Sequence, residues 1–269
     1  MSANIFRHEF RIRLRSVISW SLAVTALVVI FFSFFSIFAD QAALVNEMLK
    51  NFPPQLRAAF GMDRMNLATV LGFYGFIFTF IQLCLAIQAG NYGFGLVSIE
   101  ESELTADFLL SKPVSRTNVL TSKLLAALAS LLVTNLVLWV SSFAAITLFR
   151  GDYEYEPATL VILLLSMPIF QLFFMSIGLV ISLLVKRVRN VTPYALGLGF
   201  GMYVLNAFSG VFGDVKLESI TPYKHLDPSY IVREGALDTP LVLVNITISL
   251  IALAISYWRY IRRDIPAVS

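Results

Sequence analysis

The sequence predicts an all-α polytopic membrane protein with six transmembrane helices. Of its 269 residues, 58% are hydrophobic and only 14% are charged, whereas about a quarter are charged in a typical soluble domain. A chain of this size has too little interior to hide so much apolar surface from water. The charged residues also leave six long stretches of the chain entirely free of charge. Lipid is therefore the expected solvent for most of the molecule.

Each charge-free stretch is long enough to cross the hydrocarbon core, which needs about 20 helical residues. A charged side chain at the bilayer centre costs roughly 2.5–3.5 kcal/mol on insertion scales, so its absence over such lengths is informative. The glycines from Gly90 to Gly95 in the second stretch are interpreted as an exit from the membrane. We expect one domain over residues 1–269, with spans at about 16–39, 66–90, 122–149, 158–185, 191–213 and 239–259.

The residues before the first span form two stripes at helical spacing. One stripe is apolar and includes Phe6 and Phe10, and the other contains Arg7, Arg11 and Arg15. One interpretation is an N-terminal interfacial helix that lies in the cytoplasmic surface of the membrane. The other is a basic flank that only orients the first span, and the pattern fits both equally.

The charges also predict the orientation of the chain. An even number of spans places both termini on one side, and that side carries 13 of the 20 basic residues but only six of the 17 acidic ones. By the positive-inside rule both termini are cytoplasmic, in a multi-pass protein of the cell (plasma or inner) membrane. The basic residues are spread along the chain and form no single stripe for nucleic acid, so no nucleic-acid partner is expected.

The charge-free stretches lack the residues that intramembrane chemistry needs. An ion-coupled carrier normally has an acid or base within its spans, and a hydrolase has a base beside its nucleophile. The single cysteine and the two histidines do not supply a metal site. We therefore expect no enzyme activity, no catalytic residue, no metal site and no cofactor bound by this chain.

Amides are the most polar groups within the spans. They are interpreted either as interhelical hydrogen-bond partners, worth roughly 1 kcal/mol each, or as the lining of a translocation path. These amides are Gln82, Gln88, Asn135, Gln171, Asn206 and Asn245.

Two loops on the far side of the membrane carry structure of their own. Residues 42–50 are amphipathic at helical spacing and predict a short helix on the outer face. Residues 214–238 contain Pro222, Tyr223, Pro228 and Tyr230, and we expect this loop to fold back on the spans.

The segment between the second and third spans predicts an acidic amphipathic helix. Leu104, Phe108 and Leu109 share its apolar face, Pro113 ends it, and Ser115 or Thr117 is expected to cap the next helix. An acidic helix binds anionic lipid poorly, so this pattern favours a protein partner.

At these residues the sequence resembles the permease subunits of ABC-2 type transporters. Those proteins have six spans and a cytoplasmic stretch of the form acidic…Gly-Thr-x-(Asp/Glu)-x-Leu-Leu-x-(Lys/Arg)-Pro-Val-Ser-Arg. Leu104 stands where the family usually has glycine, and residues 52–61 and 220–228 look like the family's first and last outer loops. The matching positions here are Thr105, Asp107, Leu109, Leu110, Lys112, Pro113, Val114, Ser115 and Arg116.

The resemblance implies a cytoplasmic coupling helix, within segment 95–117, that docks on an ABC ATPase subunit. No lysine follows a glycine, so the chain lacks a P-loop and ATP-Mg would be bound by that partner. The resemblance also implies an exporter that pairs with a second permease copy or a paralogue, within the lipid bilayer. The alternative is a membrane anchor or sensory subunit that uses the same ATPase contact without a translocation path. The expected coupling residues are Glu100, Glu101, Glu103, Thr105, Asp107, Phe108, Lys112 and Arg116.

Overall fold

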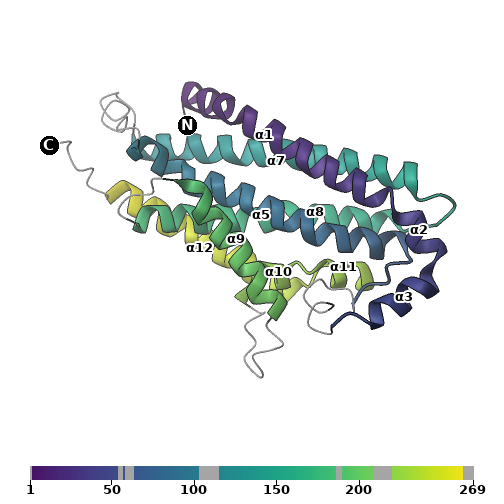
Figure 1. The fold of residues 1–269 in the computed structure, drawn as a ribbon. Helices are drawn as coiled ribbons and strands as arrows, with labels where there is room; N and C mark the ends of the chain where they lie inside the picture. Colours follow the sequence, from purple (N-terminus) through teal and green to yellow (C-terminus); the bar gives the residue numbers. More distant parts are fainter. Residues whose placement is uncertain are drawn as a thin grey trace.

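The chain forms a bundle of long helices in a computed structural model (Figure 1). The structure describes residues 2–53, 57, 64–102, 115–185, 190–208 and 220–262, and within these ranges it contains no strand, so the predicted all-α class is confirmed. The helices are α1 (Ala3–Phe32), α2 (Phe35–Asp40), α3 (Ala42–Lys50), α5 (Val70–Ser102), α7 (Arg116–Phe149), α8 (Pro157–Leu184), α9 (Val191–Phe208), α10 (Pro222–His225), α11 (Pro228–Glu234) and α12 (Thr239–Arg262).

The bundle has two ends that differ in content. Figure 1 shows that α1 begins and α12 ends at one end, which we call the terminal end. At the other end, the distal end, lie α2, α3 and α11, whereas α10 lies about midway along the bundle. The first and the last described residues thus lie at the same end of the bundle.

Five of the described helical segments are long and apolar enough to cross a membrane, which confirms a multi-pass membrane protein. They are Ala3–Asp40, Val70–Val97, Arg116–Phe149, Pro157–Leu184 and Thr239–Arg262. The predicted span 191–213 coincides with α9, whose 18 described residues include Pro193, two tyrosines and Asn206 and are not among the five. Residues 209–213 lie outside the described ranges, so a sixth crossing stays a prediction.

The N-terminal residues continue directly into the first span. α1 is one uninterrupted helix from Ala3 to Phe32, and a turn at Ser33 separates it from α2. Its buried residues recur along one side, from Arg13 to Phe32, and α1 packs mainly on α7. This geometry favours a basic flank of the first span over a separate interfacial helix.

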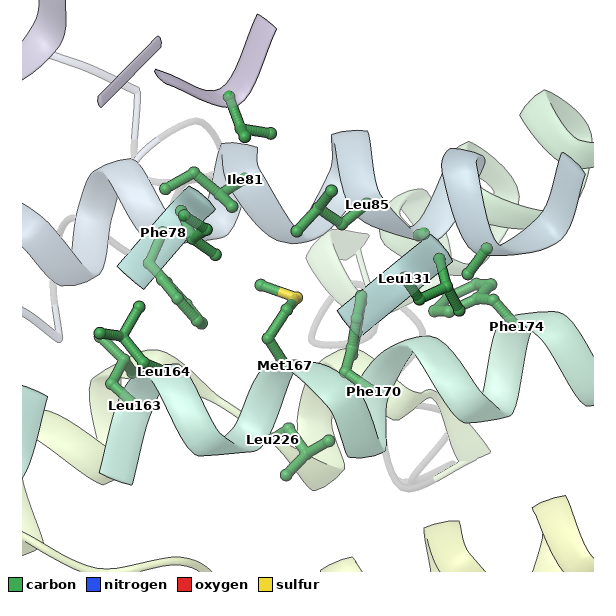
Figure 2. Packing of buried hydrophobic residues seen from close by; sticks show 14 of the residues in the cluster. Phe78, Ile81, Leu85, Leu131, Leu163, Leu164, Met167, Phe170, Phe174 and Leu226 are labelled. Atoms are coloured by element: carbon green, nitrogen blue, oxygen red, sulfur yellow. The ribbon is translucent and has the colours of Figure 1, made fainter. Parts of the chain in front are cut away.

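The centre of the bundle is the contact between α5 and α8. Figure 2 shows Phe78, Ile81 and Leu85 of α5 directed toward Met167 and Phe170 of α8, and all five side chains are fully buried. Because lipid tails are as apolar as these side chains, the contact is stabilised by close van der Waals packing and not by exclusion of water. α5 also packs on α9, and α8 on α12, so these two helices form the core of the subunit.

The glycines of α5 serve this contact, and the helix does not break at the predicted membrane exit of Gly90–Gly95. α5 continues through them to Ser102. A Cβ atom on Gly93 would collide with the carbonyl oxygen of Met175 in α8, and one on Gly90 would lie 3.2 Å from the Cβ of Ala195 in α9. The glycines thus let three helices approach closely, as small residues do in membrane proteins.

The distal loops fold as predicted. α3 spans Ala42–Lys50, the range given by its amphipathic pattern. In the last loop, Tyr223, Leu226 and Ile231 are at most 3% exposed, because α10 and α11 pack back on the long helices. The distal end is therefore closed by short helices.

Candidate functional site

A charged cluster fastens α1, α5 and α7 together at the terminal end. Glu9 of α1 accepts a hydrogen bond from Arg13 at 2.7 Å and lies 3.7 Å from the Lys123 ammonium of α7. Lys123 also donates to the carbonyl oxygen of Leu96 in α5 at 2.8 Å. Lys123 is 3% exposed and Arg13 8%. We call Glu9, Arg13, Lys123 and Leu96 the end cluster; it satisfies buried charges that would be costly alone.

The end cluster lies beside the predicted coupling segment on both of its flanks. Leu96 comes six residues before Ser102, where α5 ends, and Lys123 is in the second turn of α7. Ser115 caps α7 by accepting a hydrogen bond from the backbone amide of Asn118, which confirms one of the two predicted caps. The two helices that lead into and out of residues 103–114 are therefore joined to each other and to α1.

α12 is tied to the same flank. Arg116 donates to the carbonyl oxygen of Ile261 at 3.3 Å, in the last turn of α12, where a cation also complements the helix dipole. Thr121 of α7 and Tyr257 of α12 share a hydrogen bond of 2.9 Å between their hydroxyl groups. Of the predicted coupling residues, Arg116 thus contacts the chain's own C-terminal helix.

The other predicted coupling residues have no described side chain. Glu100 and Glu101 belong to the last turn of α5, which extends to Ser102. Outside the described residues lie Glu103, Thr105, Asp107, Phe108 and Lys112. Their role in coupling stays a prediction.

Three of the six predicted amides meet in the interior and form one hydrogen-bonded network. Gln88 of α5 donates to Thr134 of α7 at 2.9 Å and accepts from Gln171 of α8 at 3.4 Å. Gln171 accepts from Asn135 of α7 at 2.6 Å, and all four side chains are at most 4% exposed. We call these four residues the amide network; it links three helices without a charge.

The amide network extends toward α1 through a tyrosine. Gln88 donates to the Tyr92 hydroxyl at 3.3 Å, and Tyr92 donates to Ser16 of α1 at 3.2 Å. The chain of hydrogen bonds thus reaches from α8 across the bundle to the helix that also carries Glu9.

Two further amides hold the distal loop in place. Gln82 of α5 donates to the carbonyl oxygen of Leu226 at 2.8 Å, and Asn206 of α9 accepts from Thr221 at 3.1 Å. Tyr223 donates to the carbonyl oxygen of Gly199 in α9 at 3.1 Å. Burial raises the pKa of the Tyr223 phenol well above its usual value, so this donor keeps its proton.

Asn245 differs from the other five amides. It is fully buried on the stripe of α12 that also includes Val242, Ser249 and Ala252, and α12 packs mainly on α8. Neither its amide nitrogen nor its amide oxygen has a hydrogen-bond partner among the described residues. Leaving such a group unpaired costs about 1–3 kcal/mol, so Asn245 is the amide that packing explains least.

Sequence reasoning missed the end cluster. Neither Glu9 nor Lys123 is among the site residues that the sequence predicts. A signal was present, because Glu9 and Arg13 stand four residues apart, the spacing of an ion pair on a helix. Nothing local to the sequence indicates that Lys123 meets the same carboxylate.

The chain matches the protein family described as ABC-2 family transporter protein over residues 3–265, nearly its whole length. Among curated proteins there is no significant match. Among solved structures there is none either.

Proposed function

The chain belongs to the ABC-2 transporter family, and on that premise we propose that this membrane subunit is an outward-directed permease driven by a separate ATPase subunit. The end cluster carries the proposal of coupling. A coupling element must pass displacement to the membrane helices, and Lys123 joins both flanks of residues 103–114 to α1. The sequence has no P-loop of its own, so the ATP-Mg would be bound by the partner.

Exchange of two acidic residues tests the coupling proposal. With the ATPase subunit co-expressed, Glu103→Lys combined with Asp107→Lys should abolish co-purification and ATP-stimulated transport, because it reverses the acidic face offered to the partner. Asp152→Lys with Glu154→Lys is the matched control, since it changes the same charge in the loop between α7 and α8. Unchanged co-purification of the first variant would refute the ATPase contact.

The proposal of export is supported by the family resemblance and by no contact in the structure. Inside-out membrane vesicles that contain the permease and its ATPase should accumulate a cargo, found with a panel of fluorescent lipids and organic cations, when ATP is added outside. Loss of a preloaded cargo under the same conditions would instead indicate import.

We also propose that two permeases pair through the exposed face of α9. A Cβ atom on Gly197 or Gly201 would meet no atom within 4 Å, so this glycine face is uncovered in the described part of the subunit. In a Cys84→Ala background, Gly197→Cys should cross-link to a second copy. Leu148→Cys, on the exposed side of α7, is the control that should not cross-link. Equal cross-linking at both positions would contradict a specific interface.

The alternative of an anchor or sensory subunit is favoured by one observation. Five of the six amides are hydrogen-bonded inside a single subunit, as purely structural side chains would be. Asn245 separates the alternatives, because no described contact accounts for it. Asn245→Leu should reduce transport while the subunit still assembles with its ATPase if the residue lines a path. In a pure anchor the same variant keeps full activity.

A further inference from the structure

Basic residues on α1 lie on two opposite faces with different surroundings. Arg13 faces the bundle, is 8% exposed and is paired with Glu9. His8, Arg11 and Arg15 lie on the outer face and are exposed. Within the described part of the chain, neither Arg11 nor Arg15 has an acidic partner. The packing of α1 therefore accounts for one arginine and not for the other two.

The outer face is hollowed at these residues. His8, Arg11, Ile12 and Arg15 line an open depression of about 450 Å³. Two arginines one helical turn apart present planar forks of N–H donors, the geometry that suits phosphate oxygens.

The same face becomes apolar as α1 enters the span. Arg11 and Arg15 are followed at spacings of three and four residues by Ile18 and Leu22, which are 57% and 66% exposed. Positions at these spacings share one face of a helix. A single track thus begins with cations at the terminal end and continues as aliphatic side chains toward the interior of the membrane.

We propose that this track binds an anionic phospholipid, with its phosphate at Arg11 and Arg15 and its acyl chains along Ile18 and Leu22. Each basic residue near an anionic membrane surface raises the affinity for anionic lipid by about fivefold. A soluble ATPase subunit could reach the arginines but not the aliphatic half of the track, so lipid is the occupant that uses the whole surface. Like the proposed function, this proposal takes the terminal end to be cytoplasmic. It does not depend on transport.

Native mass spectrometry of the purified full-length protein tests the assignment with two probes, phosphatidylglycerol and phosphatidylcholine. The protein should prefer phosphatidylglycerol, and Arg11→Gln with Arg15→Gln should reduce that preference by about fivefold for each charge removed. Arg11→Lys with Arg15→Lys should restore most of it. The control, Arg259→Gln with Arg262→Gln, removes two exposed charges from the end of α12 at the same end of the bundle and should reduce the preference by less than the α1 variant does.

Three outcomes would overturn the proposal. The glutamine variant could retain the full preference, or the α12 control could lose as much as the α1 variant, which would indicate a general charge effect. The α1 variant could also keep its lipid preference and fail only to co-purify with the ATPase, which would make this face a protein contact. Because lipid binding is measured without the ATPase, its failure and a failure of coupling are distinguishable.

Discussion

The end cluster and the amide network join overlapping sets of helices by different chemistry. The end cluster uses ionised groups and lies where the helices reach the terminal end. The amide network uses neutral side chains and lies in the middle of the spans. The free energy needed to place a charge in hydrocarbon is several times that for an amide, so ion pairs between helices are expected at the ends of the bundle. The difference teaches that the interior can tolerate specific contacts only when they carry no charge.

Loss of Glu9 should have the largest effect on stability. Glu9→Leu removes the carboxylate that pairs with the buried Arg13 guanidinium and lies 3.7 Å from the buried Lys123 ammonium, and breaking a buried ion pair costs about 3–5 kcal/mol. Unfolding of the purified protein, followed by helical signal during titration with a denaturing detergent, measures the loss. Glu9→Gln is the control; it keeps an acceptor and should be milder.

The combination of Glu9→Leu with Lys123→Met checks that the two residues act on each other. If they do, the double variant should lose less stability than the sum of the two single variants. Simple additivity would mean that the 3.7 Å approach of Lys123 to Glu9 contributes nothing, and the contrast with the amide network would disappear.

Loss of Gln171 should cost less. Gln171→Leu removes two hydrogen bonds, the one that Gln171 donates to Gln88 and the one that it accepts from Asn135. Interhelical hydrogen bonds in membranes are worth about 1 kcal/mol each. The same detergent titration measures the change. Gln41→Leu, the same substitution at an exposed position of the distal end, should leave stability unaltered. A loss as large as that of Glu9→Leu would erase the distinction between charged and neutral fastening.

Asn245→Leu should change stability in the opposite direction. Its two polar atoms have no described hydrogen-bond partner, so an apolar side chain with the same branch point and number of heavy atoms should stabilise the subunit by about 1 kcal/mol. A higher midpoint in the detergent titration, against unchanged behaviour of Val244→Leu on the exposed side of α12, is the expected result. Destabilisation would mean that Asn245 belongs with the amide network as a packing residue.

The smallest effect is expected at Tyr153, a polar contact exposed to water at the distal end. Its hydroxyl donates to Asp40 at 2.8 Å, and this hydrogen bond raises the pKa of Tyr153 above its usual value near 10. Because the folded-state pKa is raised, the contribution is present at neutral pH and is lost as the pH rises through the raised value. In a titration of phenolate absorbance, one of the late-ionising groups should be absent from the Tyr153→Phe variant. Persistence of that group in the variant would exclude this contact as the cause.

The sequence was sufficient for the elements that depend on local pattern. The charge-free stretch ending at Phe149 and the one beginning at Pro157 coincide with the end of α7 and the start of α8. The helix at 42–50 was also recognised, because its apolar residues repeat at helical spacing. Solvent preference and periodicity are properties of the chain itself, so they can be read before any tertiary contact is known.

The elements that depend on tertiary contact could not be predicted in the same way. Gly90 and Gly93 have the composition of a loop, and only the approach of α8 and α9 explains why a helix contains them. The sequence pattern does not distinguish Asn245 from Gln88, Asn135 and Gln171. In the structure, those three amides are joined by hydrogen bonds, whereas Asn245 has no described hydrogen-bond partner. Packing across the bundle determines which faces of two helices meet, and the periodicity of the sequence does not predict it.

The lengths of α5 and α7 have a mechanical consequence. They contain 33 and 34 residues, so each is a rod of about 50 Å, whereas hydrocarbon occupies only about 30 Å. Each of these helices can therefore tilt about the point where it crosses the bilayer. A tilt of about 5° around its centre moves each tip by about 2 Å, with opposite sign at the two ends. Lys123 links α7 to α5 through its hydrogen bond to Leu96, so a force on residues 103–114, which connect the two helices, would tilt both helices together.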